Sequence, residues 1–287
     1  MIWTIVSKAE MAGYVIPPVF QYYREVVGKD QIQLKVIDED DPMTFVKGDD
    51  IILLRTASEK IVSTIKSRGL KSTAENFSVY QQSSDKETLA QTLFDNGIVV
   101  PKQYRLDEVE EGKTYFVKPR YGSESFGISS QCICHTPKEV KTQVNRIYEE
   151  LLQPVVIEDF IEGVDCTTAV YRNRGILRAH TIKVECSEIG GIQTHRGKFA
   201  YDEYCSAMKD LHGLLMDDVA KRVFSILKIR HHARIDYRLS KEGVPYLIDV
   251  NLLPGLGPSA HFSKCLLLTE NISYRDAIWA IIDSASV

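Results

Sequence analysis

Three oxygen-bearing side chains lie close together in HHARIDYRLSKEGVPYLIDVNLLPG, which spans residues 231–255. Two strand-like segments flank the turn SKEG, and if that turn centres between its Glu and Gly, Asp236 faces Asp249 across an antiparallel hairpin. Asn251, two residues beyond Asp249, points to the same face. Facing carboxylates destabilise a sheet unless a cation neutralises them, and an all-oxygen set suits Mg²⁺ or Mn²⁺. The hairpin therefore predicts a metal site.

An arginine cluster is the alternative reading of the same hairpin. Arg234 and Arg238 have the same strand parity as Asp236, so their side chains lie on the same predicted face. Either guanidinium could neutralise the acids as an ion pair. The hairpin alone leaves both interpretations open.

A lysine followed by a glycine- and serine-containing loop forms a second candidate site. Lys118 ends the strand-like run TYFVK, and the loop YGSESFG follows at 121–127. An ammonium group with nearby hydroxyls and backbone N–H groups suits phosphate. The spacing matches neither a P-loop nor a dinucleotide-binding glycine motif, so a plain hairpin loop remains an alternative. Lys86, in the first turn of a predicted helix, gives a weaker indication, because a cation there opposes the helix dipole unless an anion binds.

A third candidate is the run VVIEDFIEGVD, in which Glu158 ends an apolar segment. Exposed backbone at the end of such a strand can pair with the edge of an adenine ring. A buried strand that leads into an acidic turn explains the same residues. Without the other candidate sites, this run does not favour the adenine-binding interpretation.

The elements that must position these residues are those of an α/β protein. Strands are expected at 2–6, 33–37 and 50–55, whose apolar character suits a parallel sheet covered on both faces. Helices are expected at 17–27, 85–96 with Ser84 and Glu87 as a capping box, 136–151, 208–228 and 273–284. A strand at 154–163, a hairpin turn at 173–175 and a loop at 190–204 complete the expectation.

Composition excludes several classes of protein. The chain has 287 residues, 44% of them hydrophobic, and a net charge of −4 without a basic face, which argues against nucleic-acid binding. No apolar run is long enough to cross a bilayer, and the start MIWTIVSKAEM lacks the features of a signal peptide, so we expect a cytoplasmic protein without membrane partners. Six cysteines contain no C-x-x-C pair, which favours reduced, buried thiols over disulfides. Cys132 and Cys134 are expected on one strand face, with a metal role as the alternative.

In order along the chain, DKETLAQTLFDNGIVVP, YFVKPRYGSESFGIS, VVIEDFIEGVD and ARIDYRLSKEGVPYLIDVNLLPGLGPS resemble the ATP-grasp superfamily, and within it the D-alanine–D-alanine ligase branch. These stretches span about 84–262. The resemblance implies an α/β (α+β) ATP-grasp fold with an N-terminal parallel-sheet (pre-ATP-grasp) domain. The implied units are residues 1–80, a central subdomain at 81–160 and a C-terminal subdomain at 161–287, the last two clamping ATP.

The resemblance also implies which residues bind the nucleotide. The matching positions are Lys86, Lys118, Ser125, Glu158, Phe160, Ile161 and Asp165. The two lysines would hold the phosphates, and the serine belongs to a loop that closes over them. Glu158, Phe160 and Ile161 would lie beside the adenine, and Asp165 would bind the ribose.

A second set of matching positions implies the chemistry. Asp236, Asp249 and Asn251 look like the magnesium ligands, and Arg234 with the backbone N–H of Gly255 looks like the clamp for a tetrahedral intermediate. Two further positions complete this set. Lys198 would reach the γ-phosphate, and Ser259 would bind the carboxylate of the second substrate.

The family resemblance implies an ATP-dependent carboxylate–amine ligase that works through an acyl phosphate. Its partners would be a small-molecule carboxylate and an amine, both amino acids, and the protein would be a homodimer by analogy. Two departures keep the substrate open: Asp249 stands where the branch usually has Glu, and SKAEMAGYVIPP replaces a glycine-rich turn followed by a Glu. A dipeptide or natural-product ligase is thus an alternative to D-alanine ligation. An ATP-binding sensor or scaffold and an ATP-grasp phosphotransferase are the alternatives from other classes.

Overall fold

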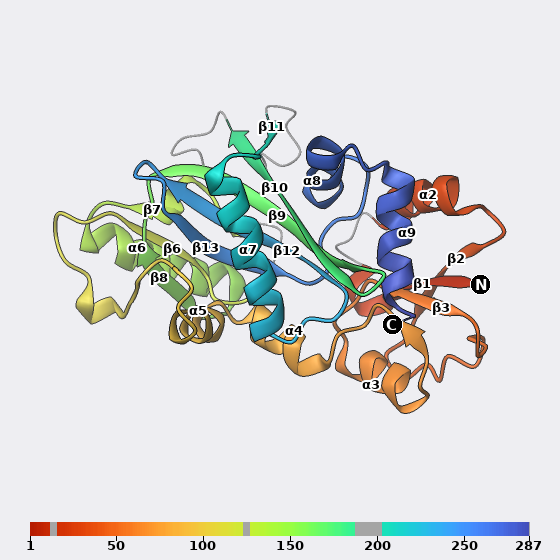
Figure 1. Cartoon of the computed structure of the whole chain (residues 1–287). Coiled ribbons are helices and arrows are strands. Elements are labelled where there is room, and N and C mark those ends of the chain that lie inside the picture. Colours follow the sequence, from red (N-terminus) through yellow and green to blue (C-terminus); the bar gives the residue numbers. More distant parts are fainter. Residues whose placement is uncertain (12–15, 123–126, 187–202, 287) are drawn as a thin grey trace.

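The structure is a computed structural model that describes residues 1–11, 16–122, 127–186 and 203–286 (Figure 1). Three sheets organise these residues, and each falls within one of the three predicted sequence units. Among the described helices, none combines the length and the apolar character needed to cross a bilayer.

The first sheet is parallel, as the apolar runs near the N-terminus predict. Its strand order is β2-β1-β3-β4, from β1 (Ile2–Ser7), β2 (Ile32–Ile37), β3 (Ile51–Leu54) and β4 (Lys71–Ser72). The helices of this part are α1 (Lys8–Met11), α2 (Ile16–Val27) and α3 (Glu59–Ser67). The predicted parallel sheet is confirmed.

The second sheet is antiparallel and carries the candidate lysine. Its order is β5-β8-β6-β7, from β5 (Gln103–Tyr104), β6 (Tyr115–Pro119), β7 (Ile133–Cys134) and β8 (Val155–Asp159). Associated elements are α4 (Phe77–Ser84), α5 (Lys86–Asp95), the short 3-10 turns η1 (Leu106–Glu108) and η2 (Ser130–Cys132), and α6 (Pro137–Leu151). Val140 and Ile147 of α6 pack on Tyr115, Val117 and Ile157 of the sheet.

The third sheet is also antiparallel and carries the candidate acids. Its order is β11-β10-β9-β12-β13, from β9 (Gly163–Asn173), β10 (Ile176–Cys186), β11 (Glu203–Ala207), β12 (His232–Ser240) and β13 (Pro245–Asn251). Helix α7 (Leu211–Ile226) packs on one face, in a cluster with Cys166 and Val170. Helices α8 (His261–Glu270) and α9 (Tyr274–Ser284) pack on the other, in a cluster with Ala169 and Tyr171 (Figure 1). Alternation along β9 thus assigns its two faces to different helices.

The hairpin of β12 and β13 has the predicted pairing at the acids. Asp236 pairs directly with Asp249, and Arg234 pairs with Asn251. Nearer the turn the register shifts by one, because Ile248 is an extra residue in β13 between two paired neighbours. The turn therefore does not centre where the sequence suggested, and this β-bulge restores the pairing before the acids are reached.

The predicted cap of α5 is wrong by one residue. Asp85, not Ser84, caps the helix: its Oδ1 accepts the backbone N–H groups of Glu87 at 3.2 Å and Thr88 at 3.3 Å. Ser84 is instead the last residue of α4, a helix that the sequence patterns did not predict. A carboxylate at the N-cap also interacts favourably with the helix dipole, which favours aspartate over the serine beside it.

Other local predictions need correction as well. The strand expected at 154–163 ends at Asp159, and the loop expected at 190–204 includes the start of β11 at Glu203, while its residues up to 202 lie outside the described residues. Cys132 lies in η2 and Cys134 in β7, so they do not share a strand face, although both are buried free thiols as expected. The helix α8 was not predicted.

One hydrophobic core joins the first and third sheets. Ile5 and Leu54 of the parallel sheet belong to the same buried cluster as Ile235 and Leu247 of the antiparallel one. The predicted boundary at residue 80 falls inside α4, and the division into 1–80, 81–160 and 161–287 remains a proposal.

Candidate active site

A pocket lies between the second and third sheets and gathers most of the predicted site residues. Its walls come from α5, β6, the segment after β8, and strands β9, β10, β12 and β13. The predicted residues that line it are Lys86, Lys118, Glu158, Phe160, Ile161, Asp165, Arg234, Asp236 and Asp249. Residues from five separate stretches of sequence therefore meet around one cavity.

A buried ion pair forms the wall on the side of the second sheet. The Nζ atom of Lys118 lies 2.6 Å from Oε1 of Glu158, and both side chains are more than nine-tenths buried. The same ammonium group donates to the carbonyl of Ile248 at 3.3 Å, so β6 contacts the bulge of β13. Burial raises the pKa of Glu158, and the charge of Lys118 opposes that rise.

Lys86 lines the pocket from the first turn of α5. Its Nζ donates to the carbonyl of Gly122 at 2.5 Å. Burial lowers the pKa of Lys86, the charge of Lys118 acts in the same direction, and Asp249 opposes both. The two lysines are thus close enough to affect each other, and an anion between them would relieve their repulsion.

A charged contact fixes α5 against the end of β6. Arg120, two residues after Lys118, donates from Nε and Nη2 to the two oxygens of Asp85 at 2.7 and 2.6 Å. Because Asp85 caps the helix that begins with Lys86, this bidentate pair sets the relative position of the two lysines.

The segment after β8 forms the apolar side of the pocket. Phe160 lies beside Phe116 with ring centroids 6.4 Å apart, and the guanidinium of Arg238 lies over the Phe160 ring at 5.9 Å. Arg238 also donates to the carbonyl of Ile161 at 3.0 Å and to Asp165 at 2.7 Å. An apolar wall with an aromatic ring suits a planar heterocycle.

The hairpin acids face the pocket, and one of them is already paired. Arg234 donates from Nε to Oδ1 of Asp236 at 2.9 Å and from Nη2 to Oδ2 at 2.8 Å. Thr167 donates to the same Oδ1 at 2.7 Å. Among the described residues, no side chain donates a hydrogen bond to the Asp249 carboxylate. The arginine alternative therefore holds for Arg234, but Arg238 pairs with Asp165 rather than with the hairpin acids.

Asn251 lies on β13 beyond the acids and is not among the residues that line the pocket. Its Oδ1 accepts the backbone N–H of Leu253 at 2.9 Å, which closes the turn that follows the strand. An amide oxygen has two lone pairs, so this contact leaves one for a metal ion.

The turn that carries Gly255 is held from the first sheet. Arg55, which follows β3 and is 8% exposed, donates from Nη2 to the carbonyls of Leu253 at 3.2 Å and Pro254 at 2.7 Å. Tyr274 of α9 donates to the carbonyl of Leu256 at 2.8 Å. These contacts fix the backbone on both sides of Gly255, which is what a backbone N–H donor in a catalytic turn requires.

Among the described residues predicted for the site, Asn251, Gly255 and Ser259 do not line the pocket. Ser259 is exposed in the turn before α8 and does not line the cavity. Ser125 and Lys198 lie outside the described residues. Their predicted roles therefore stay predictions.

Sequence reasoning missed three arginines that organise the site. Arg238 was considered only as a partner of the hairpin acids, although β12 pairs with β9 so that Arg238 lies directly opposite Asp165. Arg120 and Arg55 contact residues 35 and about 200 positions away. Only the strand order of the third sheet could have revealed the role of Arg238. Nothing in the local sequence signals the roles of Arg120 and Arg55.

Comparison with known proteins gives a consistent family. A family model described as "D-ala D-ala ligase C-terminus" matches residues 92–283, more than half of the chain. "Uncharacterized protein y4sG" of Sinorhizobium fredii is 26% identical over 215 residues, which cover 70% of this chain and 62% of that protein. D-alanine--D-alanine ligase B of Clostridium perfringens is 29% identical over 185 residues, which cover 62% and 57%. The chain thus spans about three fifths of the length of these curated relatives.

Solved structures resemble the chain over nearly its whole length. The D-alanine--D-alanine ligase from Bacillus anthracis complexed with ATP has a TM-score of 0.77 at 19% identity, covering 99% of this chain and 97% of that one. The VanG D-Ala:D-Ser ligase from Enterococcus faecalis has a TM-score of 0.76 at 15% identity, covering 99% and 98%. At such identities the likeness shows the fold, and the predicted ATP-grasp fold is confirmed.

Proposed function

We propose, from the premise that this chain belongs to the D-alanine–D-alanine ligase family, that it is an ATP-dependent ligase joining a carboxylate to an amine. The observation that carries the proposal is the pocket itself. Two lysines project from the side of the second sheet, and two carboxylates and an arginine project from the third. Such a site offers cations for phosphate oxygens and oxygen donors for a divalent ion.

The proposed reaction has two steps. A carboxylate oxygen of the first substrate attacks the γ-phosphorus of ATP, and the bond to the β–γ bridging oxygen breaks, giving an acyl phosphate and ADP. The amine of the second substrate then attacks the acyl carbon, and inorganic phosphate leaves with the bonding electrons. The amine proton passes to solvent or to a nearby base, and an amide remains.

The residues of the chain would act mainly by positioning and charge stabilisation. Lys86 and Lys118 would neutralise phosphate oxygens, and the apolar wall at Phe160 would hold the adenine. Arg234 and the N–H of Gly255 would stabilise the oxyanion of the tetrahedral intermediate. Ser125 and Lys198 are proposed to cover the phosphates, and Ser259 to bind the second carboxylate.

The donor set of the hairpin fits a hard divalent cation. Asp236 and Asp249 are directly paired on the pocket wall, and the Asn251 oxygen lies two residues further along the same strand, so all donors are oxygen. Bound there, Mg²⁺ or Mn²⁺ would neutralise triphosphate charge and orient the γ-phosphoryl group. Asp236 would then bind both the ion and Arg234.

The substrates are proposed to be amino acids in the cytoplasm, acted on by a homodimer. Family membership supports amino-acid substrates. The departures at Asp249 and at SKAEMAGYVIPP leave the identity of those amino acids open. A D-alanine ligase and a dipeptide or natural-product ligase therefore both fit the proposal.

The test is a ligation assay with purified full-length protein, ATP, Mg²⁺ and pools of L- and D-amino acids. We expect phosphate release that requires an amine substrate, with a new amide detected by mass spectrometry. A folded protein that releases no amine-dependent phosphate with any pool would overturn the proposal.

A second candidate is an ATP-binding protein that does not ligate, a sensor or scaffold. The bidentate pair of Arg234 with Asp236 favours it, because that contact occupies both oxygens of a proposed metal ligand. This candidate predicts calorimetric binding of ATP without turnover. Amide formation that disappears in Asp236→Ala would dismiss it.

A further inference from the structure

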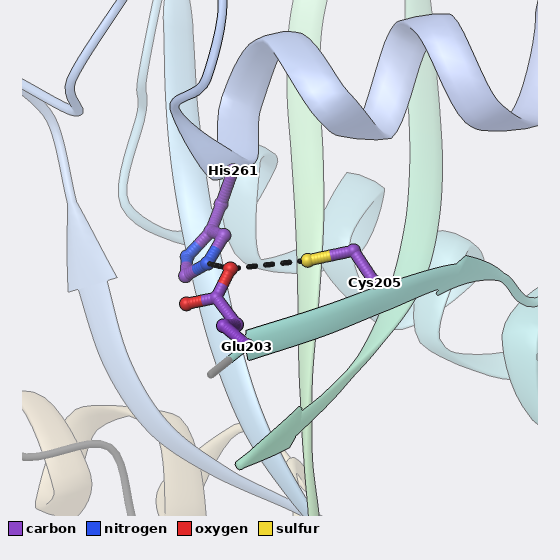
Figure 2. Close-up of side chains that lie close together, drawn as sticks. All are labelled: Glu203, Cys205 and His261. Carbon is purple, nitrogen blue, oxygen red and sulfur yellow. Dashed lines mark hydrogen bonds and ion pairs between the residues drawn. The ribbon is translucent and has the colours of Figure 1, made fainter. Parts of the chain in front are cut away.

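A second cluster of ionisable side chains lies outside the pocket, where β11 meets the first turn of α8 (Figure 2). Glu203 and Cys205 project from β11, and His261 begins α8. Nε2 of His261 lies 2.7 Å from Oε1 of Glu203, and the thiol of Cys205 donates to the same oxygen at 3.1 Å. Three different metal-ligating atoms therefore converge on one point, and all lie within 4.8 Å of one another.

The cluster is largely shielded from solvent. The side chains of Glu203 and His261 are 14% and 10% exposed, and Cys205 is half-buried. Among the residues that the structure describes, one group of histidine, cysteine and acidic side chains has the spacing of metal ligands, and it is this cluster. Burial of that degree makes an uncompensated charge costly, so the cluster needs a cation.

One cation among the described residues at the cluster is the ammonium group of Lys264, one turn further along α8. Its Nζ lies 2.9 Å from Oε1 of Glu203 and 3.6 Å from Sγ of Cys205. The Cys205 sulfur donates to the Glu203 carboxylate, so it is present as the thiol. The Lys264 ammonium is thus a counter-charge to the Glu203 carboxylate.

We propose that Glu203, Cys205 and His261 form a binding site for a transition-metal ion of the Zn²⁺ type, which takes the place of the Lys264 ammonium. The exchange balances in charge and atoms. The ion binds the sulfur, the thiol proton goes to water, and Lys264, whose side chain is 27% exposed, turns into solvent. A dication with one thiolate, one carboxylate and a neutral imidazole is neutral.

The ligand types select the class of ion. One sulfur, one nitrogen and one oxygen form a set typical of Zn²⁺ or Co²⁺, whereas Mg²⁺ and Ca²⁺ prefer oxygen alone. Metal–ligand bonds of roughly 2.0–2.3 Å need donor atoms about 3.3–3.6 Å apart. The two contacts to Glu203, at 2.7 and 3.1 Å, would lengthen slightly, and the His261 and Cys205 donor atoms already lie within 4.8 Å of each other. Three protein ligands leave the fourth tetrahedral position open.

The site would join two elements that the ligase pocket also depends on. Cys205 pairs in register with Val184 of β10, which lines the pocket. His261 begins the helix that follows the Gly255 turn. A metal ion here would fix β11 to α8, and it is independent of the oxygen-only site proposed at Asp236 and Asp249.

Cobalt substitution tests the proposal directly. Full-length protein is stripped with EDTA and titrated with Co²⁺, and its absorption spectrum is recorded. We expect visible bands of tetrahedral Co²⁺ and a near-ultraviolet thiolate-to-metal band, both lost on addition of one equivalent of Zn²⁺. Cys205→Ser should abolish the thiolate band, and Cys134→Ser, at a buried thiol far from the cluster in sequence, should retain it.

Lys264→Met separates a metal site from a simple ion-pair network. If the ammonium competes with the metal, its removal should shift the cobalt titration to lower concentration, whereas an ion-pair network would give no bands in either protein. Zn²⁺ should also protect Cys205 of the unaltered chain from alkylation, as mapped by peptide mass spectrometry, which does not depend on how the variants fold. Absence of the thiolate band together with unprotected Cys205 would overturn the proposal.

Discussion

At Arg234, an observed ion pair with the hairpin acid Asp236 coincides with a proposed catalytic role. Its guanidinium binds both oxygens of Asp236, and the two side chains are only 11% and 18% exposed. The same guanidinium faces the pocket, where an oxyanion would form in the proposed second step. Removing it should therefore damage turnover and stability through separate causes.

Arg234→Ala should reduce amide formation by about a hundredfold or more, as loss of an oxyanion donor does. It should also lower the free energy of unfolding by about 3 kcal/mol, because Asp236 is left buried without its counter-charge. The double variant Arg234→Met/Asp236→Asn removes both charges and should recover most of the stability but not the turnover. Steady-state kinetics and urea unfolding check this, and recovered turnover in the double variant would contradict the catalytic role.

Lys118 and Glu158 form the other buried ion pair of the pocket, and removal of its lysine tests it in the same way. Lys118→Met should weaken ATP binding and destabilise the protein by about 3 kcal/mol near neutral pH, since Glu158 loses its partner. The pKa of Glu158, already raised by burial, rises further without the lysine. The stability penalty should thus be small below the ordinary pKa of a glutamate and grow as pH rises.

Adding Glu158→Gln to Lys118→Met should remove that pH dependence while ATP binding stays weak. Denaturant unfolding at several pH values and calorimetry with ATP provide the two measurements. Equal penalties at acidic and neutral pH would show that the cost of Lys118→Met is packing rather than charge.

At the scale of elements, the contact between α5 and β6 decides how the two lysines are spaced. Arg120 holds the pKa of Asp85 at about 2, against burial, and the N–H and hydroxyl of Thr88 act in the same direction. A lowered pKa means that the carboxylate stabilises the fold above its ordinary pKa of 3.8 and loses that contribution as pH falls through about 2.

Asp85→Asn keeps an N-cap oxygen but loses the charged contact with Arg120, so it should cost roughly 2 kcal/mol at neutral pH. The difference from the unaltered chain should vanish near the acid end of the titration. Ser84→Ala is the matched control, because Ser84 is exposed at the end of α4 and should cost almost nothing. Thermal unfolding as a function of pH measures both, and a larger effect at Ser84 would contradict the assigned cap.

How far the elements follow from sequence depends on whether their signals are local. The assumed turn centre placed Asp236 opposite Asp249 correctly, but only because the extra residue Ile248 offsets a one-residue error in that centre. The bulge at Ile248 was not predictable from the hairpin alone, because the Ile248 carbonyl accepts a hydrogen bond from Lys118 of another sheet. The run HFSKCLLLTE gave no amphipathic pattern because apolar residues also occur on the exposed side of α8, where Leu267 and Leu268 are 47% and 41% exposed.

At the scale of the whole molecule, the first and third sheets are joined by polar contacts as well as by a common core. Glu75, 3% exposed and located before α4, accepts the backbone N–H groups of Arg230 and His231 at 2.9 Å each, just before β12. Burial raises the pKa of Glu75 to about 7, although those N–H groups act in the opposite direction. Such a contact is out of reach of sequence reasoning, because 155 residues separate the partners.

A raised pKa means that Glu75 supports the fold fully below its ordinary value of 4.5 and that this support is lost as pH rises through about 7. The corresponding decline in the free energy of unfolding is about 3 kcal/mol. Glu75→Gln cannot ionise, so its stability should be flatter over this range. Urea unfolding between about pH 5 and about pH 8 checks the slope, and parallel profiles for the two proteins would contradict the assignment.

The extra residue at Ile248 makes the hairpin tolerant of changes in length. It takes up a one-residue offset between the SKEG turn and the carboxylates, so the two halves of β13 keep different registers against one partner strand. Loss of one residue at the tip is therefore expected to remove the bulge rather than slide Asp249 past Asp236. The acid pair would keep its alignment although the tip had shortened.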